Sequence, residues 1–139
     1  MMVDYVFYIK GNPLGSALKI GISALRHVGS RLGTYQNSFG PDYEDRFERV
    51  WVGPEADIRE LERLLKIKYR SKIAGNKRGY TEWIKGVTFD DLSRDIEETI
   101  KGLGVDVTSP AHTGKLFEAD IEELKKQYIV EETQNDNNF

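Results

Sequence analysis

The sequence VDYVFYIKGNPLGSALKIGI, residues 3–22, predicts a β-hairpin. In its first half, Val3, Tyr5, Phe7 and Ile9 alternate with Asp4, Val6, Tyr8 and Lys10. Alternation is the period of a strand. Residues 11–16 are rich in turn formers, and Leu18, Ile20 and Ile22 form the apolar side of a second strand. Packing the two apolar sides together places Tyr8 and Lys19 on the same opposite face, and a register slip of one residue would expose the apolar set.

The residues after this hairpin predict a helix with an arginine at its border. Ser23 is suited to the N-cap position. Leu25, Val28, Leu32 and Tyr35 then recur at helical spacing. Arg31 lies about 40° outside this stripe on a helical wheel. Beyond a turn at residues 37–42, residues 47–52 alternate again and predict a third strand that ends at Gly53.

A second helix is predicted from Pro54, because the missing N–H of proline costs least at a helix start. Its buried stripe is expected to be Ile58, Leu61, Leu64, Leu65 and Tyr69. Glu62 lies about 20° beyond Tyr69 on the helical wheel, so its carboxylate is expected to be half solvated. Glu60 lies on the other side of the stripe and farther from its centre, which favours Glu62 as a functional carboxylate.

The rest of the chain adds helices to this core. Residues 75–79 form a basic loop, and Thr88 with Asp91 three residues on is a capping box. The third predicted helix has its apolar residues at Phe89, Leu92, Ile96, Ile100 and Leu103, and a short fourth one at Phe117, Ile121, Leu124 and Tyr128. The expected fold class is α+β, a small three-stranded antiparallel sheet flanked by α-helices, with extra C-terminal helices.

Length and composition agree with one globular domain. The chain has 139 residues, 39% of them hydrophobic and 31% charged. No apolar run approaches the length of about 20 residues that a membrane span needs. The N-terminus lacks the pattern of a signal peptide, and the absence of cysteine excludes a disulfide framework or a thiolate metal site. We therefore expect a cytoplasmic protein without a membrane partner.

The net charge of −3 hides an uneven distribution. Residues 1–88 hold 15 basic against 10 acidic residues, a net +5, and residues 89–139 hold 5 against 13, a net −8. The basic excess of residues 1–88 is an electrostatic footprint for phosphates, although runs of charged residues are more often solvated helix faces. The candidate nucleic-acid-binding residues are Arg59, Arg63, Lys66, Arg70, Lys72, Lys77 and Arg78.

The ordered motifs resemble the GIY-YIG nuclease superfamily, most closely its phage and bacterial branch with Lys-Ile-Gly as the second motif. The matching residues are Val6-Phe7-Tyr8, Lys19-Ile20-Gly21, Arg31, Leu61-Glu62 and Glu82-Trp83-Ile84. The first motif keeps only its tyrosine, Lys19 replaces the second tyrosine, Tyr35 stands where a histidine is common, and Asn76 is a poor match for a late asparagine. The resemblance covers roughly residues 3–85 and implies a nuclease core at residues 1–88. A helical extension packed on this core is expected at 89–130, and the polar residues 131–139 are expected to be a disordered acidic tail.

The chemistry of phosphodiester cleavage assigns a role to each candidate residue. The reaction needs an activated water, a cation to offset charge on the phosphoryl oxygens, and help for the leaving oxygen. We expect Tyr8 to be the general base, Lys19 its activator and Arg31 the electrostatic clamp. Glu62 would bind Mg²⁺ or Mn²⁺, because such an ion needs only one or two carboxylates. Each residue alone would more often be a packing or surface residue; their order and spacing favour a site.

The function expected is that of a metal-dependent endonuclease that hydrolyses DNA, most of all double-stranded DNA, in a bacterial or phage-infected cell. The alternative is a nucleic-acid-binding module of the same fold with little or no catalysis. A third hypothesis is a small viral interaction protein whose acidic C-terminal region covers the basic residues. The chain lacks a motif that reads base edges, so the protein is expected to be lightly specific, to act as a homodimer, or to be guided by a partner. Restriction, homing, repair and phage competition are equally compatible roles.

Overall fold

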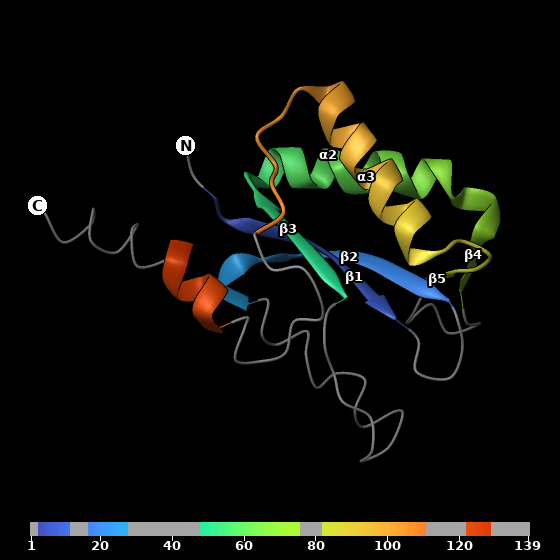
Figure 1. The fold of residues 1–139 in the computed structure, drawn as a ribbon, viewed down its shortest axis with the longest axis horizontal. Coiled ribbons are helices and arrows are strands. Elements are labelled where there is room, and N and C mark those ends of the chain that lie inside the picture. The colour runs from blue at the N-terminus through green and yellow to red at the C-terminus, as the bar shows by residue number, and fades with distance from the viewer. Residues whose placement is uncertain (1–2, 12–16, 28–47, 76–81, 111–121, 129–139) are drawn as a thin grey trace, which may run out of the picture.

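The computed structural model describes residues 3–11, 17–27, 48–75, 82–110 and 122–128. These residues form an α+β fold in which helices pack on an antiparallel sheet (Figure 1). The elements are β1 (Tyr5–Gly11), β2 (Leu18–Ala24), β3 (Arg49–Gly53), α2 (Glu55–Lys68), the 3₁₀ turn η2 (Arg70–Lys72), β4 (Ile73–Gly75), β5 (Glu82–Ile84) and α3 (Phe89–Leu103). Residues 122–128 are also helical. The predicted α+β class is confirmed.

The sheet has five strands in the order β3-β1-β2-β5-β4, and every pairing is antiparallel. The predicted hairpin is β1 with β2, in the register that sets Tyr8 opposite Gly21, and β3 pairs with the other edge of β1. The prediction of three strands was therefore too low. The two additional strands, β4 and β5, have three residues each, which is too short for an alternating pattern to identify a strand.

One face of the sheet carries the larger hydrophobic core. Phe7, Ile9 and Trp51 of the sheet pack there against both long helices. From α2 come Ile58, Leu61 and Leu65, and from α3 come Leu92, Ile96 and Ile100. Figure 1 shows α2 and α3 together on this side of the sheet. Helix α3 thus packs in the same core as α2 and the sheet. Residues 131–139, the predicted tail, lie outside the described ranges.

The opposite face of the sheet carries a second, smaller core. Val6, Tyr8, Val50 and Val52 point to this side, where Leu25 and Leu124 pack on them. Leu124 belongs to the helix at residues 122–128, which lies on the far side of the sheet from α2 and α3 (Figure 1). Residues 6–10 of β1 are therefore buried on both faces, as expected of a central strand covered on two sides.

Side chains from neighbouring segments cap the helices. Asp4, just before β1, accepts a hydrogen bond from the backbone N–H of Glu55 at 3.0 Å, and Pro54 occupies the N-cap of α2. The predicted cap of α3 is confirmed, because Thr88 accepts from the backbone N–H of Asp91 at 3.1 Å. These contacts satisfy N–H groups that have no partner within the helix.

The predicted N-cap at Ser23 is wrong. Ser23 lies inside β2, is buried, and its hydroxyl donates to the carbonyl of Ala24. The strand continues to Ala24 because it pairs with β1 along its whole length, so the tertiary pairing outweighs the local preference of serine for a cap. Residues 25–27 form a 3₁₀ turn, and residues 28–35 of the predicted helix lie outside the described ranges.

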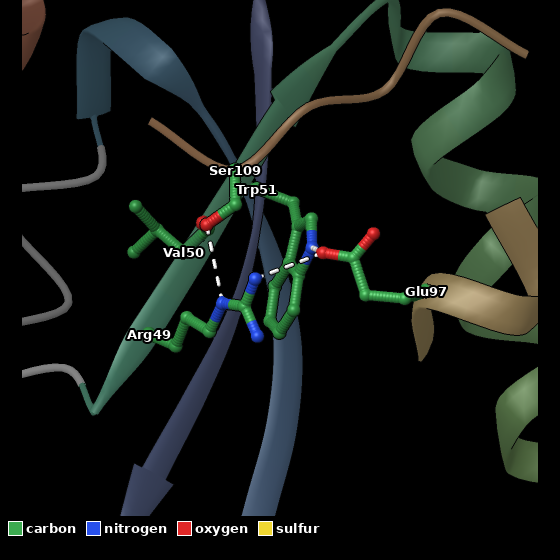
Figure 2. Close-up of polar contacts among 5 residues, drawn as sticks. All are labelled: Arg49, Val50, Trp51, Glu97 and Ser109. Atoms are coloured by element: carbon green, nitrogen blue, oxygen red, sulfur yellow. Dashed lines mark hydrogen bonds and ion pairs between the residues drawn. The ribbon is translucent and has the colours of Figure 1, made fainter. Parts of the chain in front are cut away.

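A polar cluster fastens the segment after α3 to the outer edge of β3. Thr108 forms an isolated antiparallel bridge with Val52. Figure 2 shows the side chains beside it: Arg49 donates to Ser109 at 3.2 Å and to Glu97 at 2.9 Å. Glu97 also accepts from the indole N–H of Trp51 at 2.9 Å, and the guanidinium of Arg49 lies 4.5 Å from the Trp51 ring centroid. The cluster ties β3, α3 and residues 105–109 together.

We expect Glu97→Ala to lower the free energy of unfolding by about 1–3 kcal/mol, because the fully buried Trp51 would lose the acceptor of its indole N–H. Glu97→Gln, which keeps an acceptor oxygen, should cost less. Urea unfolding followed by circular dichroism measures both. Glu98→Ala, at the next and exposed position of α3, is the control. An equal loss in Glu97→Ala and Glu98→Ala would contradict the role given to this hydrogen bond.

None of the helices in the described ranges is sufficiently long and apolar to cross a bilayer.

Candidate nucleic-acid interface

Helix α2 presents two different sides because of its sequence spacing. Ile58, Leu61 and Leu65 recur at helical intervals and are buried on the sheet. Away from this stripe, Arg59, Arg63, Lys66 and Arg70 follow one another at intervals of four, three and four residues, which places them along one side. We call these four residues the cationic row. All four are exposed, and Arg70 belongs to η2, just beyond the end of α2.

The cationic row surrounds a shallow depression with a volume of about 370 Å³. The lining consists of the four cations together with Glu62 and Ile67. Ile67 is 57% exposed, an unusual amount for a large apolar side chain. The lining holds four cations and one carboxylate, although Arg59 and Arg63 are also paired with Glu55 and Glu60 outside it. A surface rich in exposed cations is suited to a polyanion. We call this feature the α2 depression.

Glu62 lies where its helical position predicts. Its side chain is 20% exposed, and Lys66 is its ion-pair partner at 3.7 Å. Among the described residues, no group of three or more His, Cys, Asp or Glu side chains could hold a metal ion. Glu62 would therefore be a single carboxylate ligand surrounded by cations. These residues fit Mg²⁺ only when a phosphate brings further oxygens and negative charge, and Mg²⁺ commonly binds in this way.

The two arginines of α2 are held differently. Arg59 donates from Nε to Glu55 at 2.7 Å and from Nη2 to the hydroxyl of Tyr5 at 3.0 Å. Both hydrogen bonds raise the pKa of Arg59 above its usual value, and the one to Glu55 has the larger effect. Arg63 donates two hydrogen bonds to Glu60, at 2.9 and 2.5 Å. The hydrogen bond from Arg63 lowers the pKa of Glu60 below its usual value.

Tyr8 lies away from the α2 depression. Only 4% of it is exposed, and it packs in the smaller core on the face opposite α2. Its ring lies directly over Gly21: a Cβ atom at Gly21 would be 2.5 Å from the Tyr8 hydroxyl. Lys19 is half-buried on the same face of β2, directly across from Lys10. Tyr8 and Lys19 therefore share a face as predicted, but this is the face that α2 does not cover.

Of the three predicted catalytic residues that are described, the structure places Glu62 apart from Tyr8 and Lys19. Glu62 lines the α2 depression, whereas Tyr8 and Lys19 do not. Arg31 lies outside the described residues, as do Lys77 and Arg78 of the predicted nucleic-acid-binding set. Lys72 is described and is exposed in η2. The last motif of the resemblance, Glu82-Trp83-Ile84, forms β5, where Trp83 is half-buried and Ile84 is buried.

Sequence reasoning missed two residues. Tyr5 contacts Arg59, and the alternation of β1 already placed it on the same face as Phe7 and therefore on the side that α2 covers. No sequence signal identified its partner on α2. Lys10 is fully buried on the face of Tyr8. The alternation of β1 correctly placed Lys10 on the face of Tyr8. Lysine is rarely buried, however, and nothing in the sequence indicated that Lys10 would be.

The acidic C-terminal region does not cover the cationic row in the part that is described. The helix at residues 122–128 packs through Leu124 on the opposite face of the sheet. The hypothesis of a masking C-terminal region therefore finds no support among these residues. Comparison of the chain with protein-family models, with curated proteins and with solved structures finds no match.

Proposed function

We propose that this protein binds double-stranded DNA through the cationic row and hydrolyses its phosphodiester bonds with a divalent metal ion at Glu62. The observation that supports this proposal is the α2 depression, in which a half-buried carboxylate is surrounded by four exposed cations. The order of motifs that resembles the GIY-YIG nucleases agrees with it. The activity would take place in the cytoplasm of a bacterial or phage-infected cell.

The cationic row is suited to the backbone of a duplex. Arg59 and Lys66 are seven residues apart on α2, about 10 Å along the helix axis. Duplex DNA carries a negative charge for about every 1.7 Å of its length, so several phosphates lie within reach of such a row. The contacts expected are to phosphates, which give affinity without sequence preference.

Glu62 and its neighbours offer two of the groups that cleavage requires, a ligand for a metal ion and cations to offset charge. A bound Mg²⁺ would supply an activated water and positive charge at the phosphoryl oxygens. Glu62 would hold it, together with oxygens of the phosphate and water. Arg59 offers planar donors to the same phosphate, and Lys66 offers an ammonium that is paired with Glu62 when no DNA is bound. The cations then offset the charge that develops as the phosphodiester bond breaks.

A second candidate function is binding without cleavage. The burial of Tyr8 on the face opposite Glu62 favours it, because the predicted general base is then separated by the sheet from the predicted metal ligand. A module of this kind would keep the cationic row and its affinity for DNA. Specificity would come from a second copy of the chain or from a partner protein.

Incubation of the purified protein with supercoiled plasmid and Mg²⁺ distinguishes the two functions. We expect nicked and linear DNA with Mg²⁺, and none after addition of a chelator. Glu62→Gln should lower the cleavage rate at least about 100-fold while leaving DNA affinity within about threefold, because it removes the metal ligand and none of the phosphate-binding cations.

Glu98→Gln, which alters an exposed carboxylate of α3 outside the α2 depression, is the control for Glu62→Gln. It should cleave at close to the normal rate. Binding without any nicking would establish the second candidate function. No binding at all at low salt would reject both functions.

A further inference from the structure

The members of the cationic row differ in what holds them. Arg59 is hydrogen-bonded to Tyr5, a residue 54 positions away on β1, as well as to Glu55 within α2. Arg63 and Lys66 pair with Glu60 and Glu62, which are on the same helix. The Arg59 guanidinium is thus connected to the sheet, and its position is set by the fold as well as by the helix.

We infer that Arg59 is the pre-positioned phosphate clamp of the α2 depression, and that Tyr5 and Glu55 are its positioning residues. This inference rests on the proposed function, because it concerns which member of the cationic row grips the DNA backbone. It assigns to Arg59 the role of electrostatic clamp for which the sequence favoured Arg31.

The contacts of Arg59 leave it free to bind while holding it in place. A guanidinium has five N–H donors in a rigid fork. Two of them are directed to Glu55 and Tyr5, which leaves three for phosphate oxygens. The guanidinium also lies over the Tyr5 ring, 5.2 Å from the centroid, where the ring face attracts a cation. A group already ordered before binding loses less conformational entropy when the ligand arrives.

Arg63 is a natural control within the same helix. The side chains of Arg59 and Arg63 are 56% and 58% exposed, and both line the α2 depression. However, Arg63 is engaged on Glu60 through both Nε and Nη2. Three donors remain on Arg63 as well, but its two hydrogen bonds both go to a carboxylate of the same helix, so they do not connect its guanidinium to the sheet as Tyr5 connects that of Arg59. Equal charge and equal exposure therefore predict equal long-range attraction to DNA, while the difference in positioning predicts unequal affinity.

Tyr5 allows the positioning to be tested without changing any charge. Tyr5→Phe keeps the aromatic ring under the guanidinium and removes the hydroxyl that accepts from Arg59. A role limited to the packing of the ring would leave DNA affinity unchanged in this variant. Tyr128→Phe is the matched control, since Tyr128 packs against the smaller core on the opposite face of the sheet.

The experiment measures the Kd for a short fluorescent DNA duplex by anisotropy over a range of salt concentrations. We expect Arg59→Ala to weaken binding about tenfold at low salt and to reduce the salt slope by about 0.9, the value of one phosphate contact. Arg63→Ala should weaken binding only about twofold to threefold. Arg59→Lys should not restore the affinity, because an ammonium cannot form the same bidentate contact.

Tyr5→Phe should weaken binding about threefold at every salt concentration with the slope unchanged, while Tyr128→Phe binds like the unaltered protein. Equal losses in Arg59→Ala and Arg63→Ala, or normal affinity in Tyr5→Phe, would overturn the inference and leave the proposed function standing. Failure of the unaltered protein to bind the duplex would instead reject the proposed function. Circular dichroism of each variant verifies that the fold is retained.

Discussion

Replacing Arg63, Lys66 and Arg70 together by glutamine is expected to weaken binding to duplex DNA about 200-fold at a salt concentration of about 50 mM. At that salt the counterions released by one phosphate contact contribute about tenfold to affinity, and we expect such a contact from Lys66 and from Arg70 but only about twofold from Arg63. All three residues line the α2 depression and are exposed. Glutamine suits the helix at positions 63 and 66, so the loss of charge is separated from loss of structure. Anisotropy titrations at several salt concentrations give both the affinity and the slope, which should fall by about 1.8, the value of two phosphate contacts.

The control for this variant changes the same amount of charge elsewhere. Lys101 at the end of α3 and Lys125 and Lys126 in the helix at residues 122–128 lie outside the cationic row. Their joint replacement by glutamine should alter affinity less than about threefold. Similar losses in the two triple variants would mean that DNA responds to net charge alone, and the α2 depression would then have no special role.

Several elements of the described residues followed from the period of the sequence. The alternation of Phe7 and Ile9 with Val6 and Tyr8 predicted β1 and the faces of its side chains, and the helical spacing of Ile58, Leu61 and Leu65 predicted α2. The pattern was silent about β4 and β5, which have three residues each and depend on pairing with neighbouring strands. At Ser23 a local capping preference was outweighed by the long ladder with β1.

The candidate site was predicted less well because alternation assigns side chains to faces but does not say which face a helix covers. Tyr8 and Glu62 were each placed correctly on their own element, yet α2 packs on the Phe7 face of β1 rather than on the Tyr8 face. One signal was present: five of the six residues from Tyr5 to Lys10 are apolar or aromatic. A nearly continuous apolar run of this kind is typical of a strand covered on both faces, which would have predicted a buried Tyr8.

This arrangement changes what Gly21 does. In the motif Lys19-Ile20-Gly21 a glycine could serve to admit a substrate close to the backbone. In the structure it is the Tyr8 ring that occupies the space above Gly21, within the smaller core formed by Val6, Val50 and Leu124. The phenol packs on the glycine across the β1–β2 pair. The two motif residues therefore depend on each other for packing, whatever the chemistry on the α2 side.

Gly21→Ala is expected to lower the free energy of unfolding by about 2–3 kcal/mol, as overpacking of a core does. The new Cβ would lie 2.5 Å from the Tyr8 hydroxyl oxygen and 2.6 Å from its Cζ. Tyr8 is only 4% exposed and is enclosed by the smaller core, so the ring cannot move aside without disturbing Val50 or Leu124. Urea unfolding followed by circular dichroism gives the change in stability.

Gly102→Ala is the matched control for Gly21→Ala. Gly102 lies near the end of α3, where a Cβ would meet no described atom within 4 Å. Alanine there should raise the free energy of unfolding by about 0.5 kcal/mol, because it reduces the backbone entropy of the unfolded chain. In a protein that already carries Tyr8→Ala, adding Gly21→Ala should lower the free energy of unfolding much less than it does alone, since the clash needs both side chains. If Gly21→Ala were as stable as the unaltered protein, Tyr8 could not be packed on Gly21, and its burial on the face opposite Glu62 would have to be abandoned.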